Sequence, residues 1–473
     1  MIFSSYKFIF LFFPIVIAGF VLLRKFCDIK FCKIWLVIAS VFFYAQGNIL
    51  FLPLLAGTVI FNYIIIYFIN KDEKRGFKAK LFLTLGIIEN LGLLFYFKYT
   101  NFFLYNVNMI LGTDYILKNI ILPIGISFYT FQILAYVIDV YRKESEKSSL
   151  LDFFVFITFF PQLIVGPIIR HDQMADQLKS ESFKRFDKKN IMLGILLFSI
   201  GCAKKILIAD PLITHAQEFY NIMGTGNFFE SWGGVISYTF AYYFDFSGYI
   251  DMALGLGLFF NIRLPQNFNS PYKARNFADF WRRWNMTVTQ FFNDYVFRNI
   301  FKFGDRIPKL ILATIITFIV SGVWHGAGWH YIFWGVANGI LVCIANIMTL
   351  KDKKLPFFPA WCLTFFFVLL TRVLFDSNNM TQAVSVYKSL FDIGPLFTDT
   401  ASFISQGIAY FKDNIFITII TIIGAAICFF TPNTSEIADN YKPKWYHPVY
   451  CGILMTTSLF FMGTVSNFLY FQF

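Results

Sequence analysis

The sequence predicts an all-α polytopic membrane protein, and two observations carry that prediction. Hydrophobic residues make up 57% of the 473 residues and charged residues only 14%, which is far from the composition of a soluble globular protein. Apolar stretches long enough to form membrane helices recur along the whole chain. No internal repeat or long independent loop separates them, so we expect a single polytopic domain over residues 1–473.

The apolar stretches predict about eleven to thirteen helical passes, some of them incomplete. They lie at residues 8–23, 34–50, 51–69, 81–97, 119–140, 151–169, 191–209, 232–260, 310–326, 331–349, 357–375, 414–430 and 449–463. The first stretch ends without a small-residue cleavage pattern, so it is expected to be a retained helix rather than a signal peptide. The topology of residues 98–169 stays open, because prolines interrupt the apolar pattern there.

The net charge of +12 is distributed as the positive-inside rule requires of membrane loops, rather than as a nucleic-acid surface. Residues 24–33 and 70–80 are rich in Lys and Arg, whereas residues 210–231 contain none. Residues 263–309 hold nine basic residues against three acids and are expected on the cytoplasmic side. The protein is therefore expected in the inner (cytoplasmic) membrane, with its C-terminus outside the cytoplasm and no nucleic-acid partner.

Metal and disulfide chemistry is not indicated by the sequence. The seven cysteines form no CxxC pair and mostly lie in apolar stretches. The five histidines include no HExxH arrangement. We expect no metal site and no permanently bound cofactor.

His325 is the first candidate for chemistry, because it lies deep within an apolar stretch. It follows Lys309 by sixteen residues, which places it about 24 Å along a helix and past the middle of a bilayer. An ionisable side chain at that depth is costly unless it lines a protein cavity. Nearby glycines permit a broken helix or a close backbone approach. They are Gly322, Gly326 and Gly328.

Two interpretations of His325 are open. It is either a general base for a hydroxyl nucleophile, or a core histidine satisfied by a hydrogen bond. For His330, five residues later, packing is the better interpretation, because this spacing does not align the two rings on one helical face.

The segment 263–309 alternates aromatic residues with Arg and Asn, a pattern that suits short amphipathic helices at the membrane interface. At its centre is the group Trp281, Arg282, Arg283, Trp284 and Asn285. Interface anchoring is one interpretation, with Trp at headgroup level and Arg reaching phosphate. The other is an anion clamp for a phosphorylated donor arriving from the cytosol, because Arg recognises phosphate in a bidentate manner.

The sequence resembles the membrane-bound O-acyltransferase (MBOAT) family, in its bacterial branch of alginate and peptidoglycan O-acetyltransferase membrane subunits and teichoic acid D-alanyl transfer proteins. Five stretches carry the resemblance, in order: FFPQLIVGPIIR (159–170), YYFDFSGYIDMALGLG (242–257), LPQNFNSPYKARNFADFWRRWN (264–285), GVWHGAGW (322–329) and FLYFQF (468–473). The motif core spans about residues 159–349.

The resemblance implies an MBOAT-like bundle with a tunnel through the membrane, in which an acyl group passes from a cytoplasmic thioester to a hydroxyl. His325 is then the family histidine and the general base. Asn285 stands where this branch usually has a second histidine, and since Asn cannot exchange a proton near neutral pH, it is expected to orient or polarise the thioester. The family's PLGGNR segment is replaced by NIFKFGDR at 299–306.

The stretch 468–473 matches an F-x-Y-x-x-F pattern that resembles the terminal motif of acyl relays in this branch. The relay would use Tyr470 to take the acyl group and pass it to an external partner, and a phenol of pKa about 10 needs a base such as His325. The alternative is an aromatic belt at the membrane surface. Asp245 lies in an apolar stretch, where it either lines the tunnel or makes a structural hydrogen bond.

We therefore expect a membrane O-acetyltransferase that uses acetyl-CoA and acts on a cell-envelope polysaccharide, peptidoglycan first and alginate or another exopolysaccharide next. Its expected partners are acetyl-CoA, membrane lipids, the polysaccharide acceptor and an extracytoplasmic SGNH-type O-acetyltransferase. The alternatives are D-alanyl transfer to teichoic acid and a transporter without acyl chemistry. The expected catalytic residues are His325, Asn285 and Tyr470. The expected substrate-binding residues are Trp281, Arg282, Arg283, Trp284, Trp324 and Asp245.

Overall fold

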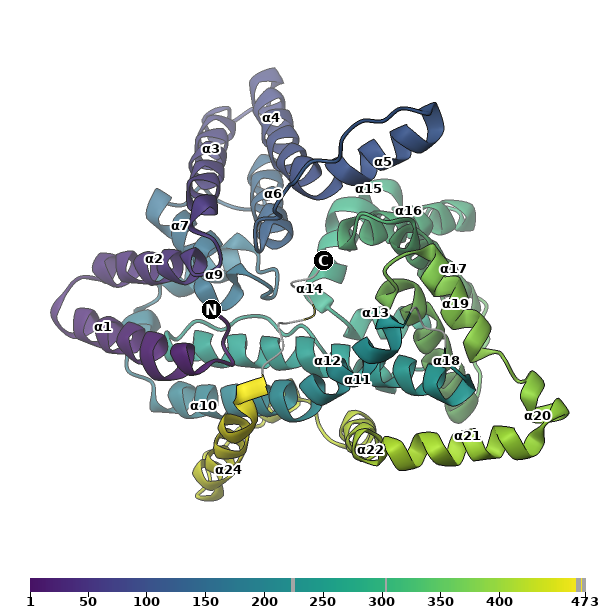
Figure 1. The fold of residues 1–473 in the computed structure, drawn as a ribbon. Helices are drawn as coiled ribbons and strands as arrows, with labels where there is room; N and C mark the ends of the chain where they lie inside the picture. The colour runs from purple at the N-terminus through teal and green to yellow at the C-terminus, as the bar shows by residue number, and fades with distance from the viewer. Residues whose placement is uncertain (223–225, 303, 465–468, 470–473) are drawn as a thin grey trace. The chain divides into compact units, whose positions relative to one another are not determined.

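The computed structural model confirms an all-α protein: the residues that it describes form helices and no strand (Figure 1). It describes residues 1–473 except 223–225, 303, 465–468 and 470–473. The chain divides into two compact units. Unit 1 comprises residues 1–199, 249–265 and 443–452, and unit 2 comprises residues 200–248, 266–442 and 453–473. The single domain expected from the sequence stays a prediction.

The helices of unit 1 come mainly from the first half of the chain. They are η1 (Lys7–Phe12), α1 (Phe13–Phe26), α2 (Ile29–Ala45), η2 (Ile49–Phe51), α3 (Leu52–Lys71), α4 (Phe77–Leu94), η3 (Phe95–Tyr99), α5 (Thr100–Leu111), α6 (Ile126–Arg142), α7 (Leu150–Thr158), α8 (Phe160–Leu163), α9 (His171–Lys179), η4 (Glu181–Lys184) and most of α10 (Lys188–Ala203). Helices α3, α4 and α6 pack against one another, and α1 packs against α2.

Unit 2 contains all the candidate site residues that the structure describes, on its helices and the turns between them. They are η5 (Lys204–Ala209), α11 (Asp210–Asn221), most of α12 (Phe228–Phe259), η6 (Pro271–Lys273), α13 (Phe277–Arg283), α14 (Met286–Phe292), η7 (Asn293–Phe297), α15 (Arg298–Ile300), α16 (Ile307–His325), α17 (Trp329–Leu350), α18 (Phe357–Asp376), α19 (Met380–Leu390), α20 (Gly394–Thr398), α21 (Thr400–Asp413), α22 (Ile415–Phe430), α23 (Thr434–Asp439), most of α24 (Tyr446–Phe461) and η8 (Met462–Thr464).

Seven helical segments of the described chain are long and apolar enough to cross a membrane, or eight if the bent pair α21 and α22 forms one span. This is fewer than the eleven to thirteen passes expected from apolar stretches alone. Several of those stretches fold into helices of 16 or 17 residues, such as α2, α6, α22 and α24. A full crossing takes about 20 residues, so these helices are short for one. The protein is a multi-pass membrane protein.

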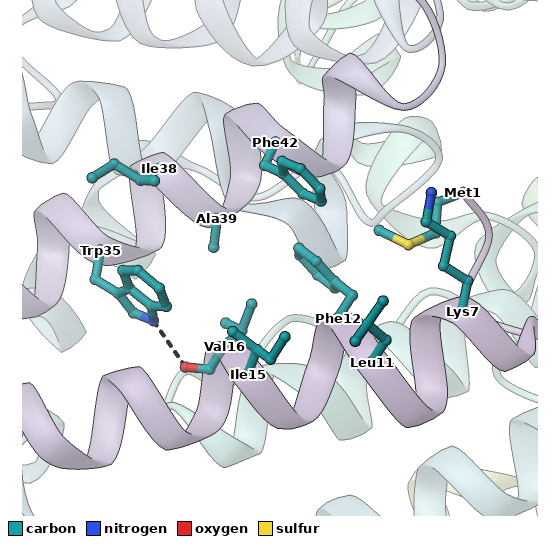
Figure 2. A pocket seen from close by; sticks show the side chains of 10 residues that line it. All are labelled: Met1, Lys7, Leu11, Phe12, Ile15, Val16, Trp35, Ile38, Ala39 and Phe42. Carbon is teal, nitrogen blue, oxygen red and sulfur yellow. Dashed lines mark hydrogen bonds between the residues drawn. The ribbon is translucent and has the colours of Figure 1, made fainter.

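An apolar groove lies between the helices η1/α1 and α2 of unit 1, with a volume of about 300 Å³ (Figure 2). The Trp35 indole nitrogen donates to the Val16 carbonyl at 2.9 Å and joins the two helices at one end of the groove. Lys7 lies at the other end. The groove lining contains no histidine, acid or hydroxyl group, so it offers no group for acyl transfer.

Candidate active site

His325 is the last residue of α16, and its side chain is buried. Helix α16 runs from Ile307 to His325, so the structure confirms that Lys309 and His325 lie about 24 Å apart along one helix. Its ring contacts the rings of Trp334 and Phe375 edge to face, with centroid distances of 5.1 and 5.0 Å. The imidazole therefore lies among aromatic side chains from α17 and α18.

Glycines allow the helices around His325 to approach closely. Helix α16 ends at the extended residue Gly326 and α17 begins after Gly328, which confirms the broken helix expected from the sequence. A Cβ at Gly322 would overlap the backbone carbonyl of Tyr331, and one at Gly326 would overlap the ring of the same tyrosine. Helices α16 and α17 consequently pack side by side (Figure 1), and this contact fixes the position of the imidazole.

Helix α13 and the residue that follows it, Trp284, place two tryptophans toward the interior of unit 2. The side chain of Asn276 caps the helix by accepting from the Asp279 N–H at 2.8 Å. Trp281 donates from its indole nitrogen to the Asn338 side chain at 3.2 Å, and its ring contacts Trp334. Trp284 stacks on Tyr242, with ring centroids 5.9 Å apart. Both side chains have packing partners inside the protein.

Asn285 begins α14 in the left-handed conformation, with φ of 43° and ψ of 54°, which asparagine tolerates better than most residues. Asn267 fixes this turn: its carbonyl accepts from the Met286 N–H at 2.9 Å, and its side chain accepts from the Thr287 N–H at 3.1 Å. The Asn285 side chain is buried, and its Oδ1 has no hydrogen-bond partner in the described part of the chain. A buried amide oxygen without a partner is uncommon and suggests a functional group.

A short aromatic chain connects the neighbourhood of Asn285 with His325. Trp284 stacks on Tyr242, Tyr242 contacts Phe375 at 5.6 Å between ring centroids, and Phe375 contacts His325. Trp324, buried beside His325, contacts Phe292 of α14 at 6.0 Å. Four elements that are distant in sequence thus meet around one cluster of rings.

The two arginines of α13 differ in their surroundings. Arg283 is two-thirds buried and donates from Nε to Asp279 at 3.0 Å, and from a terminal nitrogen to the Asn269 carbonyl at 3.3 Å. The side chain of Arg282 is 69% exposed, with Asp279 at 3.6 Å. Arg282 can therefore reach a phosphate in solution, whereas Arg283 already bonds within the protein.

Arg372 and Asp376 form a buried ion pair on α18 that sequence reasoning missed. The guanidinium lies over the Tyr242 ring at 4.0 Å and near the Phe375 ring at 4.8 Å. The pair therefore shares one ring, that of Phe375, with His325. Its signal was visible in the sequence, since an arginine and an aspartate four residues apart lie within the apolar stretch 357–375 and its edge.

Asp245 is buried in α12 and bonds to two groups of unit 2. Its Oδ1 pairs with the Lys205 ammonium at 2.7 Å, and its Oδ2 accepts from the backbone N–H of Leu469 at 2.9 Å. Lys205 also pairs with Asp210 at 2.7 Å. Lys205 belongs to the π-helical segment η5, which ends directly before Asp210-Pro211; a proline lacks the N–H that would continue the α-helical pattern.

Two further residues complete the account of the predicted site. Tyr470 lies outside the described residues, so the structure does not place it. His330 is buried in the first turn of α17, beside Tyr331 at 4.2 Å between ring centroids. The groups of His, Cys, Asp and Glu in the described chain include none that could hold a metal ion.

Comparison with known proteins points to one family. The model of the MBOAT, membrane-bound O-acyltransferase family, matches residues 38–372. A peptidoglycan O-acetyltransferase of Helicobacter pylori is 36% identical over 100% of this chain and 98% of its own length.

Two other groups of relatives align over less of the chain. A probable alginate O-acetylase, AlgI, of Pseudomonas aeruginosa is 35% identical over 83% of this chain and 75% of its own length. A teichoic acid D-alanyltransferase of Bacillus subtilis is 30% identical over 51% of this chain and 63% of its own length. All three relatives carry names of acyl-transfer enzymes.

Proposed function

Because the chain belongs to the membrane-bound O-acyltransferase family, and is therefore an O-acyltransferase, we propose that it transfers acetyl groups from cytoplasmic acetyl-CoA to a polysaccharide of the cell envelope. Peptidoglycan is the first choice of acceptor and alginate or another exopolysaccharide the second. This order rests on the full-length similarity to a peptidoglycan O-acetyltransferase. D-Alanyl transfer ranks below acetyl transfer, because the D-alanyltransferase of Bacillus subtilis aligns with about half of the chain.

His325 is proposed as the general base. An imidazole nitrogen accepts the proton of the attacking hydroxyl while the oxygen forms a bond to the thioester carbonyl carbon. The carbon–sulfur bond then breaks, its electron pair leaves on the sulfur, and the imidazolium returns the proton to that sulfur. The burial of His325 among aromatic rings supports this role, because a water-poor site limits hydrolysis of the thioester.

Asn285 is proposed to donate an amide N–H to the thioester carbonyl oxygen. Such a bond strengthens as negative charge develops on that oxygen. The left-handed backbone and the two bonds that Asn267 accepts from the Met286 and Thr287 N–H groups support the proposal, because they fix the turn that carries the Asn285 side chain. The exposed Arg282 is a candidate contact for the phosphates of the donor.

Tyr470 is proposed as the first acceptor of the acetyl group, which it would hand to an extracytoplasmic SGNH-type transferase. Its phenol loses its proton to His325, and the tyrosyl acetate then carries the acyl group. The F-x-Y-x-x-F pattern at 468–473 supports this step. A transporter without chemistry is not retained, since the family and the named relatives are acyltransferases.

Purified protein and acetyl-CoA labelled in the acetyl group test the proposal. We expect free CoA to appear together with acetyl label on the protein, and Tyr470→Phe to abolish stable labelling. Label that persists in Tyr470→Phe would remove this residue from the mechanism. If neither free CoA nor labelled protein forms, acetyl-CoA is not the donor, and D-alanyl transfer becomes the alternative to test.

A further inference from the structure

The apolar groove of unit 1 has a buried floor and exposed walls (Figure 2). The walls come from both helices and are each about half exposed, so the groove opens at the surface of unit 1. The floor consists of Phe12, Val16 and Ala39, and the walls consist of Leu11, Ile15, Ile38 and Phe42.

Trp35 closes one end of the groove. A Cβ at Gly19 would lie 2.5 Å from the Trp35 ring, so the missing side chain of this glycine lets the indole lie against α1. The bond of 2.9 Å from the indole nitrogen to the Val16 carbonyl fixes the ring in this place (Figure 2). This end is therefore bounded by an aromatic side chain that both helices hold.

Lys7 brings a positive charge to the other end. Its side chain is exposed, and its ammonium donates to the side-chain oxygen of Gln46 at 2.6 Å. An ammonium has three N–H donors, and the described part of the chain gives this one a neutral amide partner and no carboxylate. An anionic group that reaches the groove from outside the chain therefore meets a cation that the protein does not neutralise.

The length of the groove matches one leaflet of a bilayer. Helices η1 and α1 together form a segment, Lys7–Phe26, that is long and apolar enough to cross a membrane. Lys7 and Val16 are nine residues apart, which corresponds to about 13 Å along a helix. Half of a hydrocarbon core of about 30 Å is about 15 Å. A groove that begins at Lys7 and ends at Trp35 is thus about as long as the acyl-chain region of a single leaflet.

The charge of Lys7, rather than the apolar lining, decides which lipid the groove prefers. Lipid chains are as apolar as the side chains of the groove, so a chain gains little from leaving the surrounding bilayer. One lysine near a membrane surface favours a headgroup with a net negative charge by about 5-fold over a zwitterionic headgroup. The combination of lining and charge therefore fits an anionic phospholipid.

We propose that the groove between η1/α1 and α2 is a binding site for one anionic phospholipid. An acyl chain lies on the floor of the groove and ends against Trp35, and the headgroup phosphate accepts hydrogen bonds from the Lys7 ammonium. The lining belongs to unit 1, whereas the candidate catalytic residues that the structure describes belong to unit 2. The lipid site therefore does not depend on the proposed acetyl transfer.

Photo-crosslinking with two phospholipid probes tests the site. Phosphatidylglycerol and phosphatidylcholine, each with a diazirine at the same position of one acyl chain, are added in equal amounts to separate nanodiscs that hold the full-length protein. Mass spectrometry then identifies the labelled peptides. We expect residues 11–16 and 35–42 to be labelled about 5-fold more by the phosphatidylglycerol probe.

Two lysine variants show where this preference comes from. Lys7→Gln should reduce the preference for phosphatidylglycerol to about 1-fold, because the cation at the groove is lost. Lys25→Gln is the matched control, since it removes the same charge from an exposed side chain at the other end of α1. We expect this control to retain the preference.

A third variant tests the floor of the groove. Ala39→Phe places a ring where the acyl chain would lie, so preferential labelling should be lost although Lys7 is unchanged. Thermal unfolding of the purified variants checks their folding. Because Lys7→Gln changes only an exposed side chain, the lysine comparison decides the proposal even if Ala39→Phe does not fold.

Three results would overturn the proposal. Equal labelling by the two probes in wild-type protein would indicate ordinary boundary lipid. An equal loss of preference in Lys25→Gln and Lys7→Gln would show that the net charge of the protein, and not the groove, attracts the anionic lipid. A dimer in native mass spectrometry whose formation excludes phosphatidylglycerol would assign the groove to a second copy of the chain.

Discussion

The buried polar groups of unit 1 and unit 2 are satisfied in different ways. In unit 1, Asn90 donates to Asn62 at 2.8 Å, and Asn62 donates to Glu89 at 3.0 Å. Unit 1 also pairs Lys33 with Asp152, whose side chains are 10% and 14% exposed. In unit 2, the charges are buried more deeply, as in the pair of Arg372 and Asp376, where the Asp376 side chain is 1% exposed. Amide contacts of this kind join helices at modest cost, whereas paired charges are costly to bury. The more deeply buried charges therefore lie in unit 2, which also holds the proposed base His325.

Two buried imidazoles show the same contrast. His171 of unit 1 has its Nδ1 3.3 Å from the Ser145 hydroxyl and 3.2 Å from Asp172, and its ring stacks on Tyr136 at 3.8 Å. These contacts suit a structural histidine. His325 of unit 2 contacts the rings of Trp334 and Phe375, and Phe375 also lies near the Arg372 guanidinium. If His325 also had a structural role alone, the two buried histidines would not differ in function, and the distinction between the two units would be lost.

The largest expected effect is on activity and comes from His325→Gln. Loss of a general base typically costs about 10²- to 10⁴-fold in rate, and we expect CoA release from acetyl-CoA to fall by that amount while the protein still folds. His330→Gln is the matched control, since this histidine is also buried near the break between α16 and α17. Equal losses in the two variants would indicate a packing defect rather than a missing base.

The next effect is on stability and concerns the buried ion pair. Arg372→Met leaves the Asp376 carboxylate buried without its partner, and we expect about 3–5 kcal/mol of destabilisation. The double variant Arg372→Met with Asp376→Leu should recover most of that loss. Asn90→Leu in unit 1, measured by the same urea unfolding in detergent, should cost only about 1–3 kcal/mol. If Asn90→Leu destabilised the protein as much as Arg372→Met, the comparison between the two units would be contradicted.

Glycine positions give a smaller and more local effect. Gly322→Ala would place a methyl group against the Tyr331 carbonyl, which is backbone and cannot move freely; we expect a cost of about 1–3 kcal/mol and reduced activity. A Cβ at Gly86 of unit 1 would meet the Ile65 side chain at 3.2 Å, and Gly86→Ala should be close to neutral. Thermal unfolding of both variants tests whether the contact between α16 and α17 tolerates an added methyl group less well than the contact at Gly86.

The smallest effect is a pH dependence in unit 1. Burial lowers the pKa of His171 from 6.5, although the adjacent Asp172 opposes the shift. The unfolded chain therefore binds a proton at this histidine more readily than the folded chain. The stability that the buried neutral imidazole contributes is complete above pH 6.5 and decreases as the pH falls below it. His171→Phe should flatten the slope of stability between pH 7 and about pH 5. If stability depended on pH more steeply in His171→Phe than in the wild-type protein, the assigned direction of the His171 pKa shift would be wrong.

The sequence was sufficient for the fold class, because the class follows from the apolar stretches. The depth of His325 in the membrane stays a prediction. The sequence could not reveal that Phe375 contacts His325, or that Lys205 lies between Asp210 and Asp245, because these contacts join segments distant along the chain. The number of passes stays a prediction, since apolar runs such as residues 34–50 fold into helices of 17 residues, at the lower end of the length that crosses a bilayer. The roles of Asn285 and Arg282 stay predictions.

The most direct test of the account is a single-turnover measurement of acetyl transfer in wild-type and His325→Gln protein. Purified protein in excess over labelled acetyl-CoA is quenched at intervals, and its intact mass is recorded. The account predicts one added acetyl group on the wild-type chain with matching release of CoA, and a rate at least 100-fold lower in the variant. Acetylation of the variant at the wild-type rate would contradict the assignment of His325 as the base.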